Sequence, residues 1–189
     1  KKEFENNSTN DFTAIGLAVA GSPEAPFVRV KNNPILEVSE VPEDFDSYRI
    51  DDASLLVKDD KIWLYYKGRS IVHGKKGPGL TKMGVALADQ PEGPYKKHPE
   101  PLIDRGHEVL IWSQNGGIAS LASLSKSIHW SEDGINFSPE EENLKKIPIA
   151  PGLYRPHWED GNQAKEIPGW GISLKGKKGV VYLERFEMK

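Results

Sequence analysis

The sequence predicts an all-β protein that is assembled from repeated units. Residues 83–95 restate residues 15–27 at a constant offset of 68, so the chain contains copies of one unit. Each copy has an alternating strand, a Pro-Glu-small-Pro turn and an aromatic residue that starts a new strand. Residues 128–137 share this layout with an acidic glycine turn. Three such units, each followed by a hairpin, predict a β-propeller of four-stranded blades.

The individual elements follow from local patterns. Residues 14–20 alternate as a first strand, and eighteen glycines and fourteen prolines interrupt the chain before any helical period is established. Three later segments have strand composition on both sides of a polar or glycine-containing turn. These hairpins are predicted at 53–67 around 59–61, at 109–124 around 115–117, and at 172–186 around 175–179.

The length limits how many blades the chain can form. A four-stranded blade takes about 40–50 residues, and the repeats are separated by 68 and then 45 residues, which leaves room for about three blades and part of a fourth. A propeller needs at least four blades to close its ring. Residues 1–10 are polar and lead into the first repeat without a strand, which is typical of a cut end. Residues 1–189 are therefore expected to be the C-terminal part of a larger propeller domain.

The composition excludes several classes of function. The net charge of −3, with 28% charged residues, argues against a nucleic-acid-binding protein. No apolar run approaches the roughly 20 residues that cross a membrane. The absence of cysteine excludes disulfides and thiolate metal sites. It does not assign a compartment, and the periplasm and the cytoplasm both stay open.

Ionisable residues recur at one position of successive units. In a propeller the innermost strand of each blade begins near the central axis, so polar residues at these starts converge. The three positions are Asp51-Asp52 before 53–58, His107-Glu108 before 109–112, and His157 in the segment before 171–174. A proton donor beside carboxylates is what acid–base hydrolysis requires. The alternative interpretations are a turn that caps a strand for Asp51-Asp52 and an exposed loop pair for His107-Glu108.

Further candidates would contact a polar substrate. Lys67, Thr81 and Lys82 lie at strand junctions, whereas most of the segment between them is expected to be a solvated loop. A phosphate-binding loop would need a helix after it, and a strand is predicted there instead. Trp112 is either a platform on which a sugar ring stacks or a core residue. The other aromatic residues expected in the core or between blades are Trp63, Tyr65, Tyr66 and Trp130.

Three blocks of sequence, 49–69, 77–86 and 106–110, together resemble glycoside hydrolase family 117. The resemblance extends from about residue 14 to residue 137. It implies a five-bladed propeller, present here in about three to four blades. It also implies an enzyme that releases 3,6-anhydro-L-galactose from the non-reducing end of agar-derived (neoagaro) oligosaccharides, by cleaving an α-1,3 bond with inversion. The family is similar in fold to the family 43 arabinofuranosidases and xylosidases.

The resemblance also implies roles for individual residues. Asp51 matches the carboxylate that tunes the acid, and His107 matches the general acid, with Glu108 orienting or stabilising that histidine. Carboxylates near an imidazole favour its protonated form, which is the proton donor. Because alternation along a strand sends only one of two adjacent side chains to each face, Asp52 stays open as a substitute for Asp51.

The sequence departs from the family pattern in two ways. The catalytic base is an Asp of the first blade, and no segment before Asp51 carries its motif, so residues 1–189 alone are expected to be inactive. The N-terminal helices through which the family dimerises are also not found, although the full-length protein is expected to be a homodimer.

Other interpretations stay open at the level of sequence. His157 is expected to contact the substrate or a divalent ion in the central channel, where His and carboxylates would meet. A family 43-like enzyme would use Glu108 as its acid. A non-catalytic propeller that binds carbohydrate is the alternative from another class.

Overall fold

The computed structural model describes residues 12–107, 109–155, 168–177 and 179–188, and in them the chain forms antiparallel sheets. The first sheet pairs β1 (Ala18–Val19) with β2 (Val28–Arg29). The second contains β3 (Arg49–Lys58), β4 (Lys61–Arg69), β5 (Lys82–Ala88), β6 (Lys96–Lys97) and β7 (Ile103–Asp104). The third contains β8 (Leu110–Gln114), β9 (Gly117–Ala122), β10 (Ser127–Ser131) and β11 (Ser138–Glu141). The last contains β12 (Ile149–Leu153), β13 (Trp170–Lys177) and β14 (Val180–Glu187). The prediction of an all-β protein is confirmed.

The three predicted hairpins form, but the third has a shorter turn than the predicted 175–179, because residues 175–177 belong to β13. Asp59 and Asp60 join β3 to β4 with φ of 53° and 56°, and Asn115 and Gly116 join β8 to β9 with φ of 51° and 77°. Positive φ at both central residues matches the right-handed twist of the flanking strands. The third hairpin pairs β13 with β14 along their whole length.

The internal repeat is confirmed by strand register. The paired residues are Ala18↔Arg29 and Val19↔Val28 in β1–β2, and Ala86↔Lys97 and Leu87↔Lys96 in β5–β6. Both pairs keep the offset of 68 seen in the sequence. The first predicted strand is shorter than 14–20, because Asn33 replaces a strand partner there. Its side-chain amide donates to Leu17 O and accepts from Leu17 N, both at 2.7 Å.

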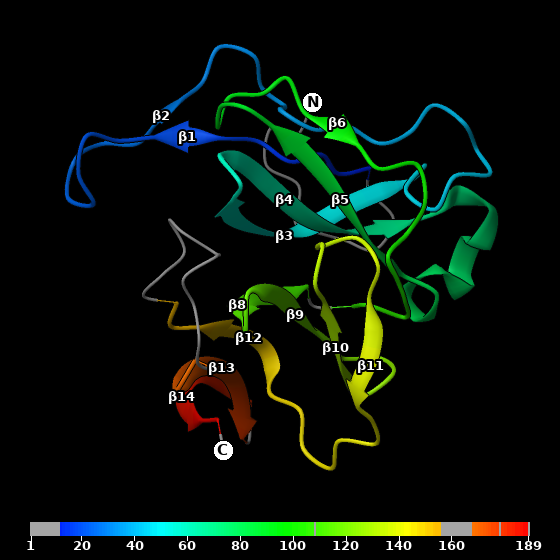
Figure 1. The fold of residues 1–189 in the computed structure, drawn as a ribbon, viewed down its shortest axis with the longest axis vertical. Coiled ribbons are helices and arrows are strands. Elements are labelled where there is room, and N and C mark those ends of the chain that lie inside the picture. The colour runs from blue at the N-terminus through cyan, green and yellow to red at the C-terminus, as the bar shows by residue number, and fades with distance from the viewer. Residues whose placement is uncertain (1–11, 108, 156–167, 178, 189) are drawn as a thin grey trace.

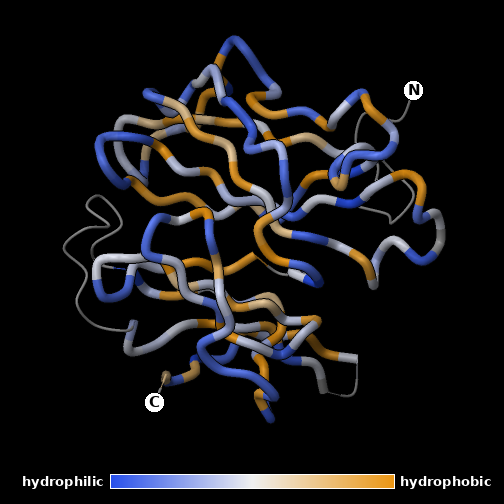
Figure 2. Tube along the Cα trace, turned by 45° about the vertical axis from the view of Figure 1, so that its right-hand side comes forward, coloured by the Kyte–Doolittle hydropathy of each residue, from blue (hydrophilic) through white to orange (hydrophobic). Residues whose placement is uncertain are grey.

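Consecutive sheets pack face to face and share a core between them. Alternation along β4 places Trp63 and Tyr65 on one face of the second sheet, and Leu64 and Tyr66 on the other. The core toward the third sheet contains Leu56, Trp63, Tyr65, Met83, Val85, Ile103, Val109, Ile111, Ile118 and Ala122. The core on the other face contains Ile15, Leu36, Ile50, Leu64, Tyr66 and Ala86. Figure 2 shows apolar residues, drawn in orange, along the strands of the sheets. This succession of sheets is compatible with part of a propeller.

The edge strands β3, β8 and β12 lie next to one another, β3 beside β8 and β8 beside β12. The sheets follow each other from the N-terminal end at the top of Figure 1 to the C-terminal end at the bottom. The prediction that residues 171–174 form the inner strand of the last unit is wrong, because β12 occupies that position. The segment that contains His157 therefore follows the inner strand of its sheet, and His157 itself lies outside the described residues.

One detail of the second sheet also differs from prediction. The segment expected to be a loop contains a 3₁₀ helix, η1 (Ile71–Gly79), which is largely exposed and is followed by β5. Gly77 is buried there, and a Cβ atom at this position would lie 2.5 Å from Cδ of Arg69, which leaves no room for a side chain. No helix in the described part of the chain is long and apolar enough to span a membrane.

Candidate active site

A largely buried carboxylate, Asp51, is held by two cations. Arg49 and Asp51 are two residues apart on β3, and Arg49 Nε donates to Asp51 Oδ2 at 2.5 Å. Lys67 is the register partner of Asp51 on β4, and its Nζ lies 3.0 Å from Asp51 Oδ1. The three side chains are 8%, 19% and 10% exposed, in the order Arg49, Asp51, Lys67. Pairing of this kind is what permits charges to be buried.

Asp52 joins the same cluster through a β-bulge. The register of β3 against β4 shifts between Asp51 and Ser54, and Asp52 has φ of 51°. The bulge turns Asp52 Oδ2 to within 2.6 Å of Lys67 Nζ, with the Asp52 side chain 38% exposed. The expectation that strand alternation separates the two carboxylates is wrong, because a bulge re-aims a side chain. β3 begins at Arg49, before the bulge, so both aspartates lie inside the strand rather than before it.

Arg49, Asp51, Asp52 and Lys67 form a charged group, called the Asp51 cluster below. This cluster and His107 lie at the same end of the second sheet. One cross-strand row runs through Asp51, Lys67, Met83 and Ile103 on β3, β4, β5 and β7. Gly106 packs on this row, because a Cβ atom there would lie 3.3 Å from Met83 Cβ. His107 follows directly and is partly buried. The structure thus places two of the predicted catalytic residues at one sheet end, and Glu108 lies outside the described residues.

The predicted substrate contacts of the second sheet differ in accessibility. Lys82 is partly exposed and pairs with Asp104 at 2.9 Å. Thr81 is 2% exposed, and its Oγ1 has no hydrogen-bond partner among the described residues. Lys67 is buried against Asp51 and Asp52. Contact of these three residues with a substrate stays a prediction.

Trp112 packs in the core in this structure. It is 2% exposed, and its Nε1 donates to Gln114 Oε1 at 2.8 Å. It lies in the core between the third and last sheets, with Leu110, Ala119 and Leu121. The described structure therefore shows the core arrangement for Trp112 and no open ring face for a sugar. Trp63, Tyr65 and Tyr66 are buried as predicted, and Trp130 packs against the core of Trp112.

Arg49 and Asp104 are charged members of this sheet end that the sequence interpretation missed. Arg49 could have been found, because residues i and i+2 of a strand share a face and Arg49 precedes Asp51 by two. No comparable signal existed for Asp104, which reaches Lys82 only through the pairing of β7 with β5.

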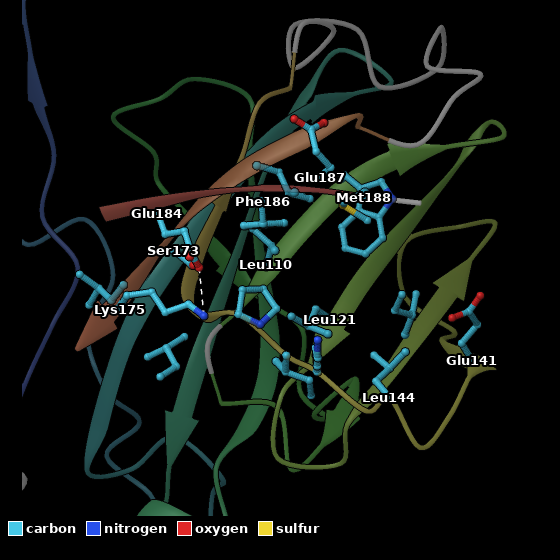
Figure 3. A pocket seen from close by; sticks show the side chains of 18 residues that line it. Leu110, Leu121, Glu141, Leu144, Ser173, Lys175, Glu184, Phe186, Glu187 and Met188 are labelled. Carbon is cyan, nitrogen blue, oxygen red and sulfur yellow. Dashed lines mark ion pairs between the residues drawn. The ribbon is translucent and has the colours of Figure 1, made fainter. Parts of the chain in front are cut away.

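Two pockets lie apart from the Asp51 cluster. One, of about 480 Å³, separates the third sheet from the last and is mainly apolar, with the Lys175–Glu184 ion pair of 3.0 Å among its lining residues (Figure 3). The other, of about 420 Å³, lies beside the buried carboxylate of Asp46. Within the described residues, no three His, Asp or Glu side chains gather as a metal site would require. The divalent ion expected near His157 stays a prediction.

Comparison with known proteins places this geometry in a structural context. No family model matches the chain. A xylosidase/arabinosidase 43A of Humicola insolens is 28% identical over 98 residues, which are 52% of this chain and 28% of that protein. The GH43_1 enzyme of Xanthomonas citri in complex with xylotriose has a TM-score of 0.54 at 12% identity, and the match covers 92% of this chain and 61% of that one.

A family 117 enzyme gives a stronger structural match. Zg3597, a family 117 glycoside hydrolase of the marine bacterium Zobellia galactanivorans, matches with a TM-score of 0.80 at 24% identity. The match covers 94% of this chain and 52% of that enzyme, so the chain spans about half the length of its structural relative. The resemblance predicted from residues 49–69, 77–86 and 106–110 is thus confirmed at the level of the fold, and the chain has the fold of part of a family 117 glycoside hydrolase.

Proposed function

We propose that the chain is the C-terminal part of a five-bladed glycoside hydrolase that acts on agar-derived oligosaccharides. The reaction is removal of the non-reducing-end, α-1,3-linked 3,6-anhydro-L-galactose with inversion. The observation that carries this proposal is the Asp51 carboxylate, held by Arg49 and Lys67 at the sheet end where His107 lies. The fold shared with Zg3597 supports the same assignment.

In this proposal His107 is the general acid and Asp51 a fixed negative charge near it. Arg49 donates a hydrogen bond to one oxygen of Asp51, and the ammonium of Lys67 lies in ion-pair contact with the other, so both oxygens face a cation. A fixed carboxylate favours the imidazolium that donates the proton to the leaving oxygen. Glu108 orients the histidine.

The base comes from an Asp outside these 189 residues. An inverting enzyme needs acid and base about 6.5–9.5 Å apart, with a water between them. The proposal therefore expects activity from the complete protein, as a homodimer, and none from residues 1–189 alone.

A family 43-like enzyme acting on arabinose- or xylose-containing chains is the second candidate. The 98-residue match to the Humicola xylosidase/arabinosidase favours it. In that case Glu108 is the acid and His107 is not. A propeller that only binds carbohydrate is the third candidate, and it predicts no Asp at the axis in the remainder of the protein.

Substrate and acid can be tested together on the complete protein. Neoagaro-, arabino- and xylo-oligosaccharides are incubated with wild type, His107→Ala and Glu108→Ala, and proton NMR follows the anomer released. The proposal expects inverted 3,6-anhydro-L-galactose from the neoagaro-oligosaccharides and loss of turnover with retained binding in His107→Ala. Arabinose or xylose release that depends on Glu108 supports the second candidate, and binding without any release supports the third.

A further inference from the structure

Arg155 links strands that are far apart in the sequence. Its Nη1 donates to the carbonyl oxygen of Leu55 on β3 at 2.9 Å and to that of Ile111 on β8 at 3.2 Å. Arg155 itself lies two residues beyond the end of β12. One guanidinium therefore connects the edge strands of the second, third and last sheets.

The carbonyl groups that Arg155 binds are on open sheet edges. β3 is the first strand of its sheet and β8 the first of the next, so each has one edge without a strand partner. Buried carbonyl groups need a hydrogen-bond partner, and the two strands lie side by side. A charged donor between them satisfies both edges and holds them at a fixed separation.

Arg155 bridges two strands through their carbonyl oxygens, an arrangement called the clamp below, and it does not act through an ion pair among the described residues. Its guanidinium is largely desolvated, and this burial lowers the pKa of Arg155. In the part of the chain that the structure describes, Arg155 forms no ion pair, and its hydrogen bonds go to the two carbonyl groups. The guanidinium of Arg155 is therefore held by the carbonyl oxygens of Leu55 and Ile111 rather than by a carboxylate of the described residues.

Both carbonyl groups that Arg155 binds lie four residues after a candidate catalytic residue in the sequence. Leu55 lies four residues after Asp51, and Ile111 lies four residues after His107. Asp51 lies on β3, and β8 begins at Leu110, three residues after His107. We propose that Arg155 is a positioning residue, which sets the spacing of β3 and β8 across the boundary of two sheets and thereby the position of Asp51 relative to the segment that carries His107. This inference rests on the proposed hydrolase function.

Activity of the complete protein tests the catalytic consequence. Arg155→Ala is assayed on a neoagaro-oligosaccharide per mole of folded protein, with Arg155→Lys as a variant that keeps the charge and Arg185→Ala as the control. Arg185 is an exposed arginine on β14. We expect kcat of Arg155→Ala to fall about 100-fold, since a displacement of about 1 Å can cost that much, with little change in KM. Added guanidinium ion should restore part of kcat to Arg155→Ala and none to Asp51→Asn.

Hydrogen–deuterium exchange tests the clamp without any substrate. Faster exchange in both β3 and β8 of Arg155→Ala or Arg155→Lys, with β10 and β11 unchanged, supports it. Unchanged exchange in β3 and β8 overturns the clamp, whatever the activity. If exchange supports the clamp but kcat of Arg155→Ala is unchanged, or added guanidinium ion restores none of it, the positioning role is overturned. Inactivity of the wild-type protein on every oligosaccharide overturns the proposed function and, with it, the positioning role, while the exchange result still decides on the clamp.

Discussion

The ammonium of Lys67 lies 3.0 Å from Asp51 Oδ1 across the paired strands β4 and β3, and both side chains are mostly buried. The same ammonium lies 2.6 Å from Asp52 Oδ2. Lys67 thus lies between two adjacent carboxylates and, together with Arg49 on Asp51, offsets charges that would otherwise repel each other at close range.

Lys67→Met should destabilise the protein strongly. Removal of one partner from a buried ion pair costs about 3 kcal/mol or more, and without Lys67 the carboxylates of Asp51 and Asp52 would share the single charge of Arg49. Urea denaturation of the complete protein measures the loss in free energy of unfolding. Lys61→Met is the matched control, because Lys61 pairs with Asp89 on the exposed surface, where such pairs contribute about 0–1 kcal/mol. Equal losses in the two variants would contradict the role given to Lys67.

Asp51→Asn should reduce turnover more than Asp52→Asn does. Asp51 contacts both Arg49 and Lys67, whereas Asp52 is more exposed and forms an ion pair with Lys67 alone among the residues that the structure describes. If Asp51 supports the acid, its neutralisation should lower kcat about 10²–10⁴-fold, as for other losses of acid–base function. Steady-state kinetics on a neoagaro-oligosaccharide decides between them. The reverse order would assign the supporting role to Asp52, which the bulge also brings to Lys67.

Alkaline pH should destabilise the fold through buried tyrosines. Burial, and then the charge of Asp46, raise the pKa of Tyr66, whose hydroxyl donates to Asp46 Oδ2 at 2.9 Å. Burial, and then Asp133, raise the pKa of Tyr65. The folded state keeps these protons while the unfolded state releases them above about pH 10, so stability is full below that pH and falls as the pH rises further.

The tyrosine prediction is checked by denaturation between pH 9 and pH 11. Tyr66→Phe should weaken the dependence on pH, and at neutral pH it should cost about 1 kcal/mol for the lost hydrogen bond. Tyr182→Phe is the control, because Tyr182 is exposed on β14. An unchanged alkaline slope in Tyr66→Phe would show that Tyr66 does not contribute to it.

Gly134→Ala should destabilise more than Gly116→Ala. Both glycines have positive φ, 79° and 77°, so alanine is strained at each by about 1–2 kcal/mol. A Cβ atom at Gly134 would also lie 2.9 Å from side-chain atoms of Ile118, Trp63 and Tyr65, whereas Gly116 has open space. Overpacking adds about 1–3 kcal/mol. Thermal unfolding of the two variants measures the difference, and its absence would show that the acidic glycine turn does not dock tightly on the second sheet.

Local chemistry explains what the sequence could predict. Asp59-Asp60 and Asn115-Gly116 tolerate positive φ, so they mark tight hairpins without any tertiary information. The continuous apolar run from Trp63 to Tyr66 is typical of a strand buried on both faces, and the structure places these residues in the cores on the two faces of the second sheet. The repeat at an offset of 68 predicted equivalent strand pairs, and the registers agree.

Long-range geometry explains what the sequence could not predict. β12 contains Pro151 and Gly152, which argue against a strand in a sequence, yet an edge strand tolerates both. At the bulge, Asp52 accepts a hydrogen bond from Lys67, fifteen residues away. Arg155 reaches Leu55 across one hundred residues, and no local pattern encodes such a contact.

The most direct test is a crystal structure of the complete Asp51→Asn protein with a bound neoagaro-oligosaccharide. The account predicts that residue 51 and His107 lie beside the same terminal α-1,3 linkage, with His107 within hydrogen-bond reach of the leaving oxygen. An oligosaccharide bound elsewhere, with His107 out of reach of any glycosidic oxygen, would contradict it.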